Sequence, residues 1–261
     1  MPTTSALSPF SPCDISSCCL CGSNQSLSGE HKIKAAILRT EFGRQRLVIG
    51  RRGEGYRHVQ GPGSKAFHFA APVCAPCNNA RTRPADLAFE EFHAVVRQLT
   101  YDGKDPMAAL DHPRFSLAGD LGLDVRRYFA KLLCCHLAEV GAPRQEALSE
   151  FAIGRSDSNG IQLAMDKDHT WVHSQTEFPG LPFAAHGGLA VFGDRQTFSP
   201  STFYSTLTAG PVRYKYQARL TEEGQAQMAA ETPEFFDWCR DRVRAGVAQP
   251  VSEETKLVLG L

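Results

Sequence analysis

Apolar residues recur at steps of three and four in three segments, a spacing that places them on one face of an α-helix. The first predicted helix follows Pro84, the second runs from Asp124 to the helix-ending Gly141, and the third begins near Pro233. The predicted buried stripes are Ala88, Phe92, Val95, Val96 and Leu99; Val125, Phe129, Leu132, Leu133 and Leu137; and Phe236, Cys239, Val243 and Val247.

Short β-type runs, bounded by Gly, Pro, Asn or Asp, predict strands between these helices. Two of these runs lie in the N-terminal third, at 47–49 and 67–69. The others lie in the second half, at 161–165, 189–192 and 212–218. His169 and His173 stand four residues apart in a segment whose pattern does not favour a helix, so they need not share a face. The predicted helices and strands do not alternate regularly along the chain, which predicts an α+β fold.

Composition narrows the class of protein. The 261 residues are 42% hydrophobic and 21% charged, which excludes wholesale disorder, collagen and coiled coil. The chain has no run of 18 apolar residues and no secretory signal pattern, so we expect a cytoplasmic protein without a membrane partner. Residues 1–12 are rich in Ser, Pro and Thr, which predicts a disordered tail.

The formal net charge of zero conceals an uneven distribution. Residues 31–83 hold eleven lysines and arginines against two glutamates, a net charge of +9, whereas residues 84–261 carry −7. Local positive charge attracts a polyanion even where the total is neutral. The N-terminal third is therefore the part that we expect to meet nucleic acid.

Nine cysteines include two C-x-x-C pairs, Cys18/Cys21 and Cys74/Cys77. A short spacer lets both sulfurs of a pair reach one ion, so the two pairs predict a tetrahedral structural Zn²⁺ site. Buried free thiols and a thioredoxin-like redox pair are the alternatives, although no βαβ pattern surrounds either pair. Cys13 or Cys19 could replace one of the four ligands; the remaining cysteines, Cys134, Cys135 and Cys239, are interpreted as core thiols.

Residues that could take part in catalysis lie between the two cysteine pairs and directly after the second pair. Ser28-Gly29-Glu30-His31 lies between the pairs, and Asn78-Asn79-Ala80-Arg81 follows Cys77 directly. Together with the two C-x-x-C knuckles, these residues make segment 18–92 resemble the HNH endonucleases, which have a ββα-metal site. The resemblance implies a zinc-stapled HNH-like nuclease domain over 13–105, followed by an α+β domain of unknown role over 106–261.

The resemblance also implies a role for each site residue. His31 would be the general base, Glu30 and Asn78 would hold a catalytic Mg²⁺ or Mn²⁺, and Arg81 would contact phosphate. The chemistry is consistent, because a neutral histidine accepts a proton near pH 7 and hard cations prefer oxygen ligands. Asn79 is an alternative ligand, and Asn78 is alternatively a helix cap. His68 stands where the family has its middle asparagine, and would hold the loop or bind the metal.

The basic residues around this segment are predicted to contact the DNA backbone, a mode of binding that is largely independent of sequence. A solvated loop is the alternative interpretation, and Lys65 adds to the local charge. The predicted contacts are Lys32, Lys34, Arg44, Arg46, Arg51, Arg52, Arg57, Arg81 and Arg83.

Three functions remain open from the sequence. The first is a metal-dependent HNH-like endonuclease that cuts DNA, or RNA, for example in phage defence. The second is a zinc-stapled nucleic-acid-binding or interaction module without catalysis, and the third is a thiol redox protein. In the first two, residues 106–261 would position the nuclease or bind a protein partner or activator.

Overall fold

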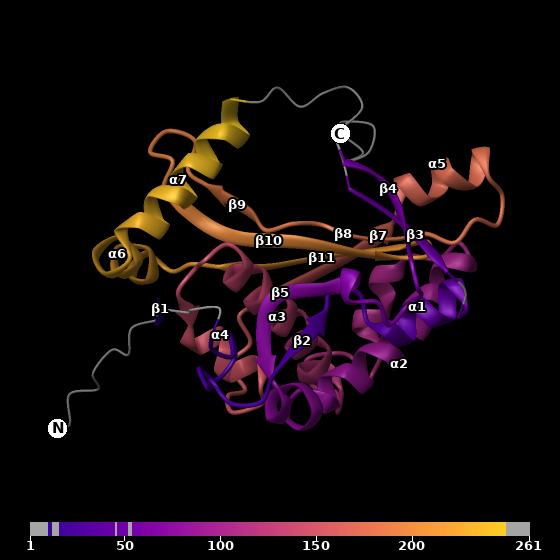
Figure 1. The fold of residues 1–261 in the computed structure, drawn as a ribbon, viewed down its shortest axis with the longest axis horizontal. Helices are drawn as coiled ribbons and strands as arrows, with labels where there is room; N and C mark the ends of the chain where they lie inside the picture. Colours follow the sequence, from indigo (N-terminus) through magenta and orange to yellow (C-terminus); the bar gives the residue numbers. More distant parts are fainter. Residues whose placement is uncertain (1–9, 12–15, 45, 52–53, 249–261) are drawn as a thin grey trace.

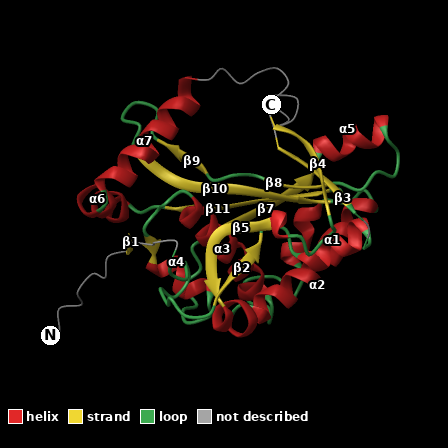
Figure 2. Cartoon of the chain, in the orientation of Figure 1, coloured by secondary structure: helices red, strands yellow, loops and turns green. Residues whose placement is uncertain are grey.

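The computed structural model describes residues 10–11, 16–44, 46–51 and 54–248 (Figure 1). The helices are α1 (Ala35–Phe42), α2 (Arg83–Tyr101), α3 (Gly122–Glu139), α4 (Glu146–Ala152), α5 (His169–Glu177), α6 (Glu222–Glu231) and α7 (Pro233–Ala248). The strands are β1 (Phe10–Ser11), β2 (Leu27–His31), β3 (Leu47–Arg51), β4 (Glu54–Val59), β5 (His68–Cys74), β6 (Arg144–Gln145), β7 (Ile161–Lys167), β8 (Ala184–His186), β9 (Ala190–Gly193), β10 (Pro200–Ala209) and β11 (Val212–Arg219). The α+β class is confirmed (Figure 2).

The largest sheet is antiparallel and has five strands, in the order β7-β11-β10-β8, with β9 pairing along the other end of β10. Strand pairs β2–β5, β3–β4 and β1–β6 form separate two-stranded sheets. Of the predicted tail 1–12, only β1 is described, and it pairs with β6. The pair β3–β4 lies within the long connection from β2 to β5, together with α1.

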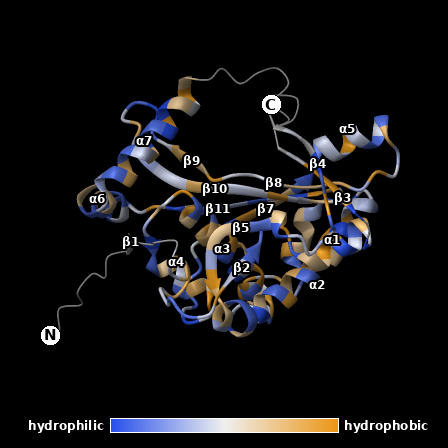
Figure 3. Cartoon of the chain, in the orientation of Figure 1, coloured by the Kyte–Doolittle hydropathy of each residue, from blue (hydrophilic) through white to orange (hydrophobic). Residues whose placement is uncertain are grey.

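Helix α3 is the centre of the molecule. It packs against α2, α4 and β5 as well as against β7 and β10 of the large sheet. Its residues are buried on nearly every side, as expected for a helix that is enclosed by other elements. In contrast, hydrophilic and hydrophobic stretches alternate along α2 and α7, which are buried on one face only (Figure 3).

One continuous cluster of buried residues extends from Cys18 to Val243. It includes residues on both sides of the border at 105/106, such as Phe89 of α2 and Tyr128 of α3, whose rings stack at 3.9 Å. The division into domains 13–105 and 106–261 stays a prediction. The shared core nevertheless means that α3 is available to complete any site on the N-terminal strands.

The three predicted helices are present and most of each predicted stripe is buried. Val95, Leu99 and Phe236 are only partly buried, Phe235 lies deeper than Phe236, and Val247 is 45% exposed. The expectation that 169–173 is not helical is wrong. Asp168 caps α5 by accepting a hydrogen bond from the Trp171 backbone N–H at 2.8 Å, so His169 and His173 do share a helix. No helix in the described part of the chain is long and apolar enough to cross a membrane.

Candidate functional site

The two C-x-x-C pairs meet in space. The sulfurs of Cys18, Cys21, Cys74 and Cys77 all lie within 4.8 Å of one another, and they form the sole metal-ligating cluster found among the described residues. Tetrahedral Zn²⁺ with Zn–S bonds of about 2.3 Å separates its sulfurs by about 3.8 Å, so the four thiols fit that ion. The cluster is consistent with the predicted structural Zn²⁺.

Local backbone geometry brings the sulfurs together. The Gly22 N–H donates to the Cys18 carbonyl at 2.8 Å in a tight turn where Gly22 has a positive φ of 73°. Cys74 ends β5 and Cys77 begins a π-helical turn, Cys77–Arg81, that leads into α2. The cluster therefore fastens a loop, the end of a strand and the start of a helix to one point.

Electrostatics in the cluster favour a cation. The hydrogen bond from the Cys77 thiol lowers the pKa of Cys18 to about 4, whereas the same hydrogen bond and burial raise the pKa of Cys77. One of the four thiols, Cys18, is therefore stable as a thiolate, whereas burial and the negative charge of Cys18 oppose ionisation of Cys77. A bound Zn²⁺ removes that resistance, because all four sulfurs can then ionise.

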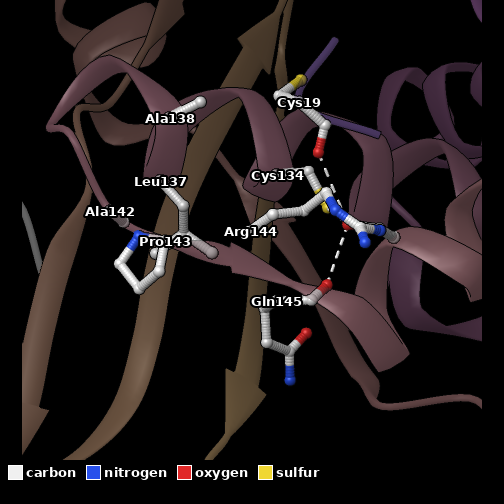
Figure 4. A pocket seen from close by; sticks show the side chains of 9 residues that line it. Cys19, Cys134, Leu137, Ala138, Ala142, Pro143, Arg144 and Gln145 are labelled. Carbon is white, nitrogen blue, oxygen red and sulfur yellow. Dashed lines mark hydrogen bonds between the residues drawn. The ribbon is translucent and has the colours of Figure 1, made fainter. Parts of the chain in front are cut away.

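The alternative ligand Cys19 points elsewhere. Its Sγ lies 3.7 Å from the Sγ of Cys135, and both are buried. Figure 4 shows side chains that line the neighbouring cavity, among them Cys19 and Cys134. The cavity has a volume of about 10 Å³, room for about one water, and the Ser149 hydroxyl donates to the Cys19 carbonyl at 3.5 Å. Cys134, Cys135 and Cys239 are buried and form no disulfide, as predicted for core thiols. Cys13 lies outside the described residues.

Strands β2 and β5 present two histidines side by side. His31 pairs with His68 across the strands after a β-bulge, and their Nε2 atoms lie 3.1 Å apart. Gly29 makes room for this arrangement, because a Cβ at that position would lie 2.4 Å from Nδ1 of His68. His68 therefore contacts the predicted base, in keeping with a role in holding it.

The environment keeps His31 neutral. Burial, with further contributions from His68, Lys131 and Arg39, lowers the pKa of His31 to about 4. At pH 7 the ring is therefore unprotonated, which is the form that a general base requires.

Glu30 lies in an unexpected ion-pair network. The ammonium of Lys131, on α3, is completely buried and contacts Glu30 Oε1 at 3.1 Å and Asp86 Oδ1 at 2.6 Å. Although burial opposes its charged form, the two carboxylates hold the pKa of Lys131 above its usual value. A predicted metal ligand is thus already paired with a cation from the chain itself.

Asn78 lies next to this network. Its amide nitrogen donates to Ser28 Oγ at 3.2 Å and to the Gly29 carbonyl at 3.3 Å, which turns the side chain toward β2. An open cavity of about 430 Å³ adjoins it. The residues that line this cavity are Lys34, Asn78, Asn79, Arg83, Asp86 and Leu87. Asn78 is therefore placed between the Glu30 strand and this open cavity.

The predicted DNA-contacting residues have different surroundings. Lys32 pairs with Glu139 at 3.0 Å, Lys34 pairs with Glu90 at 2.9 Å, and Arg81 donates to the Cys77 sulfur at 3.4 Å. The exposed members are Arg44, Arg46, Arg57, Arg81 and Arg83, together with Lys65. Arg52 and the side chain of Arg51 lie outside the described residues. Lys34 and Arg83 reach the cavity.

Sequence reasoning missed Lys131 and Asp86 as parts of the site. Asp86 resembles an ordinary acidic residue in the first turn of α2, and Lys131 stands in an apolar helix 101 residues after Glu30. The one signal in the sequence was the positive charge of Lys131, because a lysine on an enclosed helix requires a partner of opposite charge. The pattern could not indicate which partner.

Comparison with known proteins gives no further guidance. None of the protein-family models, curated proteins and solved structures compared with this chain matches it.

Proposed function

We propose that this protein is an HNH-like endonuclease that hydrolyses phosphodiester bonds of DNA, with His31 as the general base. The observation that carries the proposal is the juxtaposition of Glu30-His31, at the end of β2, with Asn78, in the π-helical turn that leads into α2. The cysteine cluster fixes this ββα arrangement, and an open cavity adjoins it.

The chain's own residues supply several parts of the reaction. Neutral His31 accepts a proton from the attacking water, while His68 fixes the orientation of its ring. Lys34 and Arg83 line the cavity and offer positive charge to a phosphate. Arg81 supports the cysteine cluster through the Cys77 sulfur, so we assign it to the zinc site in preference to the phosphate.

A catalytic divalent cation fits the donor atoms present. Glu30 and Asp86 offer carboxylate oxygens and Asn78 an amide oxygen, all hard ligands of the kind that Mg²⁺ and Mn²⁺ prefer. When bound, such an ion stabilises negative charge on the phosphate and the leaving oxygen.

Plasmid cleavage tests the proposal. The zinc-loaded full-length protein and its His31→Ala variant are incubated with supercoiled plasmid and Mg²⁺ or Mn²⁺, and the nicked and linear products are quantified. We expect the wild type to cut and His31→Ala to be slower by about 100-fold or more, the usual contribution of a general base. Equal cleavage by both proteins would reject His31 as the base.

One observation favours a second function, a zinc-stapled nucleic-acid-binding module without catalysis. The Glu30 side chain, 9% exposed, is already engaged by Lys131. Binding to a labelled duplex that weakens with salt, combined with no cleavage of plasmid, single-stranded DNA or RNA, would support this alternative.

A further inference from the structure

The β3–β4 pair is a two-stranded ribbon that projects from the rest of the protein. It pairs with no other strand in the described part of the chain, and Figure 1 shows it extending from α1 and away from α2 and α3. Leu47 and Val59, which face each other at its base, are buried. One position further along, Val48 is 57% exposed and His58 is also exposed. A two-stranded ribbon without further packing adds little stability, so the fold alone does not explain it.

Positive charge on this ribbon lacks a partner within the described part of the chain. Residues 43–60 contain five arginines and one glutamate. Arg44, Arg46 and Arg57 are exposed, and no ion pair joins any of them to a described carboxylate. Arg46 directly precedes β3 and Arg57 lies on β4, so the charge follows both strands. The ribbon therefore favours an anionic partner that offers negative charge along two rows.

The ribbon is close enough to the candidate site for one extended ligand to reach both. Only α1 and two short connections, 32–34 and 43–46, separate His31 from β3. The eight residues of α1 span about 12 Å, whereas one turn of duplex DNA spans about 34 Å. Arg39, exposed in the last turn of α1, continues the positive charge toward the site.

We propose that the β3–β4 ribbon docks in the major groove of duplex DNA, with Arg44, Arg46 and Arg57 at the phosphates. The inference rests on the nucleic-acid substrate of the proposed function and not on catalysis. The major groove is about 12 Å wide, admits a two-stranded β-ribbon and is flanked by two rows of phosphates. Val48 and His58 share one exposed face of the ribbon and are available to the base edges.

Fluorescence anisotropy of a labelled duplex tests the docking. The zinc-loaded full-length protein is titrated without added divalent cation, so that nothing is cut, and the measurement is repeated at several salt concentrations. The ribbon variant replaces three arginines by a neutral polar residue, Arg44→Gln, Arg46→Gln and Arg57→Gln. The control variant removes three exposed arginines from the C-terminal half, Arg195→Gln, Arg219→Gln and Arg242→Gln. Thermal unfolding checks that both variants are folded.

We expect the ribbon variant to bind the duplex at least roughly 10-fold more weakly than the wild type. Its plot of log K against log salt concentration should be shallower by about two to three, since each lost phosphate contact removes about one. The control variant should match the wild type. Equal affinity and slope in the ribbon variant and the wild type overturn the proposal, and so does an equal loss in the control variant.

A second measurement distinguishes the major groove from the outer phosphates and needs no variant. Glucosylated hydroxymethylcytosine leaves the phosphates of a duplex unchanged but fills its major groove, into which the substituent projects. We expect the wild type to bind this duplex at least roughly 10-fold more weakly than the unmodified duplex. Equal affinity for the two duplexes overturns the proposal.

Failure of this inference and failure of the proposed nuclease function give different results. If the ribbon variant loses duplex binding while the wild type cuts no nucleic acid, the nuclease function fails and the docking ribbon stands. If the wild type cuts plasmid and His31→Ala does not, while the ribbon variant binds the duplex like the wild type, the docking ribbon fails and the nuclease function stands.

Discussion

The absence of a single Cβ allows the two histidines of the candidate site to meet. Replacing Gly29 by alanine would place a methyl group 2.4 Å from Nδ1 of His68, so the ring would have to leave its position against His31. We expect Gly29→Ala to lose about 1–3 kcal/mol of stability, as overpacking usually does, measured by urea unfolding. Gly160→Ala, where a Cβ has open space, is the control, and equal losses would contradict the prediction.

Adjacent cysteines should behave in opposite ways. Cys18 belongs to the four-sulfur cluster, whereas Cys19 contacts Cys135 in the core. We expect Cys18→Ser to lose most of its bound zinc and Cys19→Ser to keep it. Zinc released from the purified, reduced proteins by acid, measured with a colorimetric chelator, decides the question. Retention of zinc by Cys18→Ser would mean that another residue is the ligand.

At the scale of elements, a buried histidine joins α2 to β11. His93 Nδ1 lies 2.7 Å from the Tyr214 hydroxyl, and burial, with a smaller effect of Arg97, lowers the pKa of His93 to about 4. The unfolded chain therefore binds a proton at a higher pH than the folded one. Stability from this group is present above about pH 6.5 and is lost as the pH falls toward 4.

Urea unfolding at pH 7 and pH 5 measures this linkage. We expect His93→Gln to lose less stability than the wild type between the two pH values, although it is less stable at pH 7. His136, whose pKa burial lowers to about 3, accounts for part of the remaining dependence. An unchanged pH dependence in His93→Gln would show that His93 is already protonated or exposed in solution.

A helix or strand could be predicted from the sequence where its own residues determine it, and was missed where contacts with distant segments determine it. Helices α2 and α3 have apolar residues at steps of three and four, a pattern that is visible in the sequence without knowledge of their neighbours. Strand β10 was missed, because its Thr- and Ser-rich sequence acquires a buried side from pairing with β8, β9 and β11. Helix α5 was missed because its cap, Asp168, outweighs a weakly helical pattern.

The candidate site divides in the same way. The four clustered cysteines follow from the spacing of two short motifs, and His31 was predicted as the base from its place between them. The partners of Glu30 depend on the packing of α3, and no spacing in the sequence indicates that packing. His68 lay between these cases, because its position was recognised but its contact with His31 required the register of β2 and β5.

At the scale of the whole molecule, the N-terminal segment should not fold alone. A fragment of residues 1–115 lacks α3, whose Tyr128 and Phe129 pack against Phe89 of α2 and which supplies Lys131. We expect this fragment to lack cooperative thermal unfolding and to cleave no DNA. Circular dichroism with heating provides the measurement, with the full chain as reference. A fragment that unfolds cooperatively would establish an independent N-terminal domain.

The position of Lys131 on α3 also affects the order in which parts of the site form during synthesis of the chain. Chains grow from the N-terminus at about 5–20 residues per second, so the ribosome releases Glu30, the cysteines and Asp86 several seconds before Lys131. During that interval the cysteine cluster can take up zinc while α2 still has an uncovered apolar face. We expect the contacts of Glu30 and Asp86 with Lys131 to form only after α3 has been synthesised, so the proposed nuclease activity would be absent from shorter nascent chains.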